Sequence, residues 1–461
     1  MRRVLALLTA AVLFLLCACL ETNVPDDGTM TGPPIETEPA GEPPVIVVSG
    51  DLGPATVVRG DKASDFVATL TGKVSAAMKK VAPDTGVETD WVKNASDVEE
   101  KYGSRPEILI GSTNRPESEA AAEGLGAGEW RIFSLSPKIA IAGGGELALE
   151  AACETFASHV YELDGMIVYN GPTEGEAEGY RFIGTNQKQS RVDVFRMTLG
   201  EPGTVLERSF SYSYYNVADA RLRVIDGKTV LLAAFGPSNA SVTDYETGRT
   251  LWTASNTANN PHACEYIRVG DVDVIAVAAT AGNEVRFYDM KDSSKNYESL
   301  EFEDAHGALW DPELGLLWIQ GRKVLAGYRL SADGGKITVV PEEGRTYTIP
   351  TDWSHDLQPF YGDTDKLWVT TGTAVYLFSK STGEFSTSFA GAEYVSKKNV
   401  KGIGNYSDGT TVFLIPDGEF KDWTGATVDA VLLRGSRAFP FRVSITGAGF
   451  YKVRSFNTDY Q

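Results

Sequence analysis

The sequence predicts a multidomain chain in which an N-terminal α/β domain is followed by an all-β propeller, most simply one with five blades. Three observations support this. Helical periodicity is confined to the first half of the 461-residue chain. From about residue 191, short β-type runs alternate with turn signals roughly every 8–12 residues. Within that region, a unit that contains a histidine recurs at intervals of 44 and 49 residues.

The first residues have the features of an export signal. Arg2 and Arg3 precede an apolar run that is too short to span a membrane easily. The run ends in Leu16-Cys17-Ala18-Cys19, which resembles a bacterial lipobox. The resemblance implies cleavage after residue 18, a lipid on Cys19 and attachment of the exported protein to a membrane of the cell envelope. The alternative is an ordinary secretory signal.

Residues 19–44 are rich in Pro, Gly, Thr and acidic side chains, and we expect them to form a disordered spacer. The formal charge of the whole chain is −20. This charge argues against nucleic acid as a partner, because nucleic-acid binding needs a basic surface.

Residues 45–190 have the pattern of an α/β domain. Helical spacing of apolar residues follows a possible N-cap at Asp61 or Ser64, and a second amphipathic helix is expected around residues 147–161. Between them, residues 107–113 and 129–144 predict strands. The remaining cysteines, Cys153 and Cys264, are expected to be unpaired thiols in different domains.

The stretch "EILIGSTNRPES" and the residues from "EWRIFSLSPKIAIAGG" to "FASHVY" resemble the accessory α/β domain that precedes the catalytic barrel of many bacterial carbohydrate enzymes. The resemblance covers about 140 residues. It implies a carbohydrate context and no chemistry in this domain itself. The catalytic barrel is not evident in the sequence that follows, so glycosidase activity is not implied.

Residues 191–461 are predicted to form the propeller. His262, His306 and His355 each lie 12 or 13 residues before an apolar residue in the middle of the next strand. Extending this register outward places Asp219 and Lys401 at the same repeat position, which gives five repeats. The last run, "GFYKVRSF", could pair with "RVDVFRMTL" and close the ring, which would remove exposed sheet edges.

Equivalent positions on the inner strands of a propeller converge on its channel. Asp219, His262, His306, His355 and Lys401 are therefore predicted to ring one mouth. The histidines could bind a divalent metal such as Mn, Fe, Zn or Ca, histidine with lysine could hold an anion such as a uronate or sulfate, or one group could act as a general base. The alternative is that each histidine only bonds the backbone of a neighbouring blade.

Further side chains close to the ring positions are candidate ligand contacts. Trp310 and Trp353 could stack on sugar rings. The polar candidates are Glu265, Asp356, Gln358 and Asn399. For each of these residues, the alternative is packing in the core or between blades.

The segments "NVADARLRV", "NNPHACEYIRVGDVDVIAVAATAGNEVRFYD", "AHGALWDPELGLLWIQG" and "SHDLQPFYGDTDKLWVTTG" resemble an uncharacterised family of bacterial β-propeller proteins that are often secreted or lipid-anchored. More distantly, the pattern is similar to propeller lyases that act on oligouronides with a histidine-bound metal. We therefore expect a surface lipoprotein whose propeller mouth binds an extracellular glycan or acidic oligosaccharide. The alternatives are a polysaccharide lyase or hydrolase that uses the same ring, and a scaffold that binds another protein.

Overall fold

The structure is a computed structural model that describes residues 46–49, 55–92, 97–135, 137–164, 166–199, 203–333 and 336–460. The predicted signal peptide, the lipidation site Cys19 and the spacer lie outside these residues. No helix in the described part of the chain is long and apolar enough to cross a membrane. Cys153 and Cys264 are both buried free thiols, as the sequence predicts.

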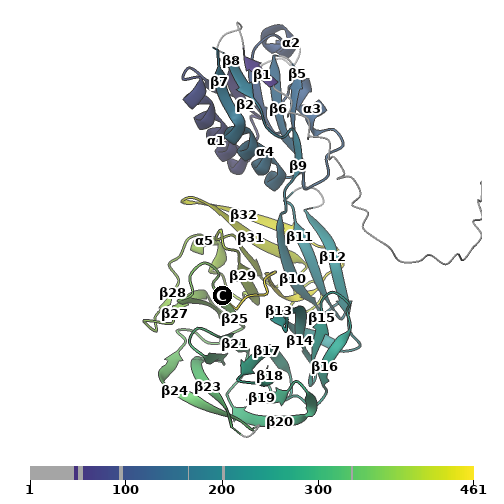
Figure 1. Cartoon of the computed structure of the whole chain (residues 1–461), viewed down its shortest axis with the longest axis vertical. Coiled ribbons are helices and arrows are strands. Elements are labelled where there is room, and N and C mark those ends of the chain that lie inside the picture. Colours follow the sequence, from purple (N-terminus) through teal and green to yellow (C-terminus); the bar gives the residue numbers. More distant parts are fainter. Residues whose placement is uncertain are drawn as a thin grey trace, which may run out of the picture. The chain divides into compact units, whose positions relative to one another are not determined.

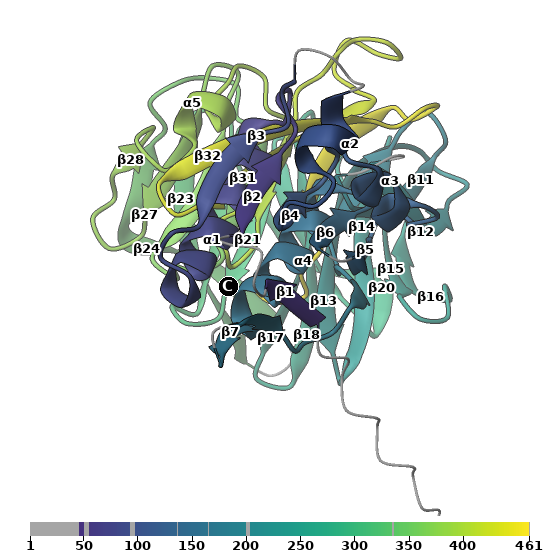
Figure 2. The same cartoon turned by 90° about the horizontal axis from the view of Figure 1, so that it is seen from above.

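The N-terminal part contains a mixed six-stranded sheet in the order β3-β2-β4-β6-β5-β9 (Figure 2). Strands β2, β3, β4 and β6 run parallel, and β5 and β9 are antiparallel additions. A second sheet has the order β1-β8-β7. The bounds are β1 Ile46–Ser49, β2 Thr56–Arg59, β3 Gly86–Thr89, β4 Glu107–Ile110, β5 Glu129–Leu135, β6 Lys138–Gly143, β7 Val160–Leu163, β8 Met166–Tyr169 and β9 Glu174–Glu176.

Helices cover both faces of the six-stranded sheet. Helix α1 (Asp65–Val81) begins at Ser64, whose side chain accepts a hydrogen bond from the amide of Val67 at 3.2 Å. α1 packs beside α4 (Glu146–His159) on one face (Figure 1). α3 (Pro116–Ala122) packs on the other face through Ala121, and α2 (Asp97–Tyr102) precedes β4. Both predicted helices and the predicted strands are therefore present.

The rest of the chain forms six four-stranded antiparallel sheets, the blades of a propeller (Figure 1). Blade 1 contains β10 Tyr180–Asn186, β11 Arg191–Met197, β12 Thr204–Ser211 and β33 Phe450–Ser455; blade 2 contains β13 Tyr215–Ile225, β14 Lys228–Gly236, β15 Asn239–Asp244 and β16 Thr250–Ala254; blade 3 contains β17 Pro261–Val269, β18 Val272–Ala279, β19 Glu284–Asp289 and β20 Asp292–Glu301. Blade 4 contains β21 Gly307–Asp311, β22 Leu316–Gln320, β23 Val324–Asp333 and β24 Lys336–Thr348; blade 5 contains β25 Asp356–Pro359, β26 Lys366–Thr370, β27 Val375–Ser379 and β28 Phe385–Ser386; blade 6 contains β29 Gly402–Asn405, β30 Thr411–Leu414, β31 Thr427–Arg434 and β32 Arg437–Ser444, preceded by α5 Ala392–Val395.

The prediction of five blades is wrong by one. Five blades contain the repeat that the sequence shows, and the additional blade is assembled from the two ends of the propeller sequence. Its inner strand β33 pairs with β10, where Phe182 lies opposite Ser455 and Asn186 opposite Phe450. β11, the expected partner of β33, pairs with the other edge of β10. The ring is therefore closed, but β33 pairs with β10 and not with β11 as predicted. β10 belongs to the propeller, although its residues fall within the range predicted for the α/β domain.

Blade 6 packs against the backbone of the closing strand through two glycines. A Cβ atom on Gly402 would lie 2.5 Å from the amide nitrogen of Val453, and one on Gly404 would lie 2.5 Å from that of Ser455. Both distances are shorter than van der Waals contact allows, so β29 can approach β33 only without side chains at these positions.

We expect Gly404→Ala to lower the free energy of unfolding by about 1–3 kcal/mol, because the new methyl group must displace the β33 backbone. Gly72→Ala is the matched control, since Gly72 lies within α1 and has no atom within 4 Å of the added Cβ. The control should raise stability by about 0.5–1 kcal/mol. Denaturant unfolding of both variants measures this, and equal stability of Gly404→Ala and wild type would contradict the close approach.

Candidate ligand site at the channel mouth

A cavity of about 450 Å³ opens at one mouth of the propeller channel. Among the residues that line it, one from each blade lies at an equivalent place near the start of the inner strand. In order from blade 2 to blade 6, and then blade 1, these are Ala218, His262, His306, His355, Lys401 and Tyr451. We call these six residues the mouth ring. The structure therefore brings the three predicted histidines and Lys401 together around one cavity.

A recurring backbone conformation presents the mouth ring. In blades 2 to 6, the residue two positions before the ring residue has a left-handed conformation, with φ between 50° and 62°. These residues are Asn216, Asn260, Asp304, Trp353 and Asn399, at successive spacings of 44, 44, 49 and 46 residues. Asn and Asp tolerate this conformation better than other residues with a side chain. The tight entry into the inner strand is thus a constant feature of the repeat.

Trp353 departs from this pattern. It is the one bulky residue among the five left-handed positions, with φ of 62°, and its side chain lines the cavity. Trp353 is 56% exposed, and the guanidinium carbon of Arg322 lies 4.2 Å from the centre of its ring. A large aromatic residue is strained in this conformation, and such strain concentrates at ligand-binding sites. Trp353 is therefore held at the mouth at a cost in stability.

The three ring histidines form a contiguous row. The ring centres of His262 and His306 are 4.8 Å apart, and those of His306 and His355 are 5.8 Å apart. Nδ1 of His262 lies 3.0 Å from the carbonyl oxygen of Asn260, and Nδ1 of His306 lies 3.2 Å from that of Asp304. A carbonyl accepts only from a protonated nitrogen, so Nδ1 carries a proton in both rings, and a neutral ring of this kind has Nε2 as an acceptor.

Burial and neighbouring cations keep imidazoles of this row uncharged. Burial, together with His306 and Lys452, holds the pKa of His262 well below its ordinary value. Burial and the charge of Lys401 lower the pKa of His355 to about 2. The Lys401 ammonium donates to Nε2 of His355 at 2.9 Å. Burial and repulsion from Lys452 lower the pKa of Lys401 to about 8, so it is a cation at neutral pH.

Asp219 lies below the mouth ring instead of within it. Strand β13 is irregular between Tyr215 and Asp219, and Ala218 takes the position equivalent to the histidines. Asp219 accepts a hydrogen bond from the amide of Cys264 at 3.1 Å, just as Asp356 accepts one from the amide of Ile403 at 3.2 Å. The true equivalent of Asp219 is therefore Asp356, the residue after His355.

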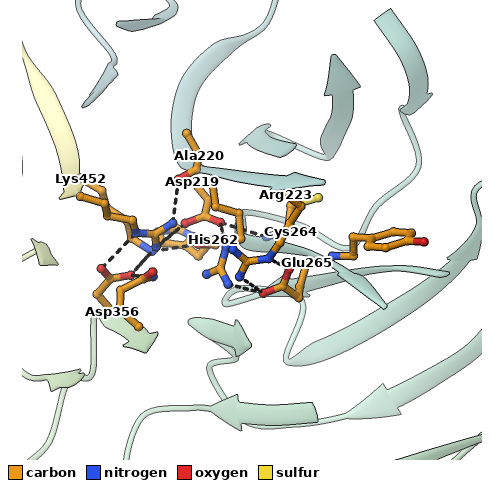
Figure 3. Close-up of polar contacts among 12 residues, drawn as sticks. Asp219, Ala220, Arg223, His262, Cys264, Glu265, Asp356 and Lys452 are labelled. Atoms are coloured by element: carbon orange, nitrogen blue, oxygen red, sulfur yellow. Dashed lines mark hydrogen bonds and ion pairs between the residues drawn. The ribbon is translucent and has the colours of Figure 1, made fainter. Parts of the chain in front are cut away.

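Asp219 and Asp356 belong to a buried ion cluster that fills the channel beneath the ring. Lys452 Nζ lies 3.4 Å from Asp219 and 3.2 Å from Asp356, and it donates to the carbonyl oxygen of His262 at 3.0 Å (Figure 3). Arg454 pairs with both carboxylates. Burial alone would raise the pKa of each carboxyl group, but the charges of Arg454 and Lys452 outweigh it and hold both pKa values below the ordinary range.

Of the tryptophans and polar side chains predicted as further ligand contacts, only Trp353 lines the cavity. Glu265 is fully buried and pairs with Arg221 and Arg223 lower in the channel (Figure 3). Trp310 packs with the apolar core between blades 3 and 4, and Gln358 is buried and donates to Asp356 at 3.3 Å.

The cavity also has walls that the repeat register did not indicate. Trp423, which follows β30, is 45% exposed and donates its indole N–H to Gln187 at 3.1 Å. Lys421 donates to Asn216 at 2.6 Å. Trp423, Gln187 and Asn216 line the cavity. None of the described residues that line it is Asp or Glu.

The metal hypothesis finds no preformed ligand set. Within the described residues, no group of three or more His, Cys, Asp or Glu side chains is arranged to hold a metal ion. In addition, Nε2 of His355 already accepts from the Lys401 ammonium, and this cation would repel a metal. The Lys401 cation therefore disfavours a divalent metal at His355.

Removing one of the two cations that join both buried carboxylates should destabilise the fold. We expect Arg454→Met to cost about 3–5 kcal/mol, since it leaves buried charge uncompensated. Arg442→Met is the control, because the Arg442 side chain is 69% exposed and pairs only with Asp429 in an ion pair at 2.8 Å. That loss should be at most about 1 kcal/mol. Equal unfolding midpoints in denaturant for the two variants would contradict the assigned role of Arg454.

Trp353→Asn should increase stability by about 1–2 kcal/mol, because Asn relieves the left-handed strain at this position. Trp423→Asn serves as the control: Trp423 is a second exposed tryptophan of the same cavity, without a positive φ. It should give no gain. Thermal unfolding compares the two, and a loss of stability in Trp353→Asn would show that Trp353 is present for packing.

Comparison with known proteins places the propeller in a family. No curated protein matches the chain. Two solved structures are similar over part of the chain. One is titled "Crystal Structure of Mitotic Checkpoint Complex" (13% identity, TM-score 0.38, 58% of this chain and 81% of that chain). The other is a functionally unknown protein from Desulfotomaculum acetoxidans DSM 771 (16% identity, TM-score 0.37, 60% of this chain and 80% of that chain). Residues 211–455, more than half of the chain, match a family of unknown function, DUF6528. The chain belongs to this uncharacterised family, and its family region is a β-propeller.

Proposed function

We propose that the mouth ring binds an acidic saccharide, through a carboxylate or sulfate on the sugar. The observation that carries this proposal is the charge of the cavity. Lys401 supplies a cation, the ring imidazoles supply acceptors for sugar hydroxyls, and no Asp or Glu is among the described residues that line the cavity. An anion that enters this partly buried site gains charge-assisted hydrogen bonds from Lys401, while the nearby Asp304 carboxylate is paired with His306, whose Nδ1 lies 3.3 Å from its Oδ1.

The aromatic side chains at the rim favour a sugar over a small inorganic anion. Trp353 and Trp423 are exposed, whereas the ring histidines are each less than 10% exposed and lie deeper. The flat faces of tryptophan and the apolar face of a pyranose ring are complementary in shape and polarity. The strained backbone at Trp353 adds to this argument, because a position that elsewhere contains Asn or Asp here presents an aromatic surface.

The same proposal includes the location of the protein. We propose that the chain is exported and attached to the envelope through a lipid on Cys19. A lipid anchor followed by the acidic spacer would hold the propeller outside the cell, where extracellular glycans are present. The resemblance of residues 45–190 to accessory domains of carbohydrate enzymes supports this context. Mass spectrometry of the membrane-extracted protein tests the anchor, and an unmodified Cys19 in an intact N-terminus would contradict it.

A panel of oligosaccharides tests the binding function. Uronate oligomers, sulfated oligomers and neutral oligomers of matched length are titrated into residues 45–461 by calorimetry. Binding of one acidic class with no binding of neutral sugars supports the proposal and identifies the anion. Binding of neutral sugars with equal affinity would overturn it. Appearance of shorter products with the absorbance of an unsaturated uronate would identify the site as that of a lyase.

Lys401→Met should weaken binding of the acidic oligomer by at least about tenfold, because it removes a charged hydrogen bond. Lys398→Met makes the same change at an exposed lysine three residues away and should leave the affinity unchanged.

The affinity of the wild-type protein for the acidic oligomer should be full below about pH 8 and fall as the pH rises above it. The reason is that free Lys401 has a pKa of about 8 and binds the anion only when it is protonated. A flat pH profile in wild type would contradict the role of Lys401.

A further inference from the structure

The channel beneath the mouth ring is closed by side chains along its length. Lys452 and Arg454, both on β33 of blade 1, pair with Asp219 of blade 2 and Asp356 of blade 5. Each of these four side chains is at most 5% exposed. Charged groups from three blades thus meet at the centre, and the ion cluster forms the floor of the cavity.

A second barrier lies farther down the channel. Glu265 of blade 3 pairs with Arg221 and Arg223 of blade 2, and all three side chains are almost completely buried. A ligand could pass this point only if the buried ion pairs of Glu265 with Arg221 and Arg223 were broken.

The C-terminal tail covers the opposite opening. The carbonyl oxygen of Asp459 accepts hydrogen bonds from Arg223 at 3.3 Å and from Tyr361 at 3.0 Å. Tyr460 donates to the carbonyl oxygen of Tyr266 at 2.8 Å, and the guanidinium carbon of Arg223 lies 4.2 Å from the centre of the Tyr460 ring. The tail is thus bonded to blades 2, 3 and 5.

A ligand therefore enters and leaves the mouth by the same opening. A polymer cannot thread through the channel, and the 450 Å³ cavity holds about one or two sugar residues. The charged group of the ring, Lys401, lies inside the cavity, while Trp353 and Trp423 lie at its exposed rim. This order places the acidic group of the ligand deepest and the adjoining sugar at the rim.

We propose that the site recognises the end of an acidic saccharide chain: a terminal sugar with a carboxylate or sulfate inserts into the cavity, and the next sugar stacks on the rim tryptophans. This inference rests on the proposed function and extends it from a ligand class to a position on the ligand. If the protein binds chain ends, one protein molecule occupies each recognised end, whatever the length of the saccharide chain. If it binds chain interiors, the number of protein molecules bound per saccharide chain increases with chain length.

The test counts bound proteins per chain. Calorimetric titration and sedimentation velocity use residues 45–461 with the acidic class identified by the panel, as a trimer, a hexamer and a dodecamer. End recognition predicts one protein per chain at all three lengths, with affinity per chain constant within about twofold. A stoichiometry that rises with length, or an affinity that grows in proportion to length, would overturn end recognition while leaving the proposed function intact.

Modified ends give an independent readout on the same oligomers. Borohydride reduction opens the sugar at the reducing end, and enzymatic elimination leaves an unsaturated sugar at the other end. One of the two modifications should weaken binding at least about tenfold, since it removes polar contacts of the inserted sugar. If neither modification changes affinity, the inference is wrong. Absence of Lys401-dependent binding to every oligomer would instead refute the proposed function itself.

Discussion

The pairing of the last strand, β33, with β10 is the interaction on which the rest of the structure depends. It joins the two ends of the propeller sequence into one sheet and so removes the two open edges that an unclosed ring would expose. The same strand supplies Tyr451 to the mouth ring and Lys452 and Arg454 to the floor of the cavity. Six consecutive residues therefore close the ring, contribute one side chain to the wall of the site and supply both cations of its floor.

Electrostatics link the floor to the mouth. Beneath the ring, Lys452 and Arg454 pair with the carboxylates of Asp219 and Asp356, which offset much of their charge, and Arg221 also lies 3.7 Å from Asp219. Lys452 nevertheless lies close enough to lower the pKa values of His262, His355 and Lys401, after the larger effect of burial. The result is a mouth in which His262 and His355 remain neutral and Lys401 is charged. In the proposed function, Lys401 supplies the charge that pairs with an anionic ligand.

The periodic features of the sequence were sufficient to predict the propeller and four of the mouth-ring residues, because histidine is rare in this chain and recurs at the blade spacing. The prediction failed where periodicity is interrupted. Irregularity in β13 shifts Asp219 by one position, and the blade built from both ends contains no histidine to reveal it. The sequence did contain a signal for the start of each inner strand. Residues that tolerate a left-handed backbone recur two positions before the mouth-ring residue, at Asn216, Asn260, Asp304 and Asn399. Trp423 and Gln187 have no counterpart in the repeat, and only the fold places them at the cavity.

The most direct test of the account follows the histidine imidazoles themselves. The chain has four histidines, three of them in the mouth ring, and His159 on α4 bonds within its own helix at 2.8 Å. NMR of protein labelled at the histidine Cε1 position, titrated with an acidic oligosaccharide, reports on all four at once. The account predicts that the signals of His262, His306 and His355 shift in a saturable manner while that of His159 remains unchanged. Binding that leaves the three ring signals unmoved would contradict the claim that the channel mouth is the ligand site.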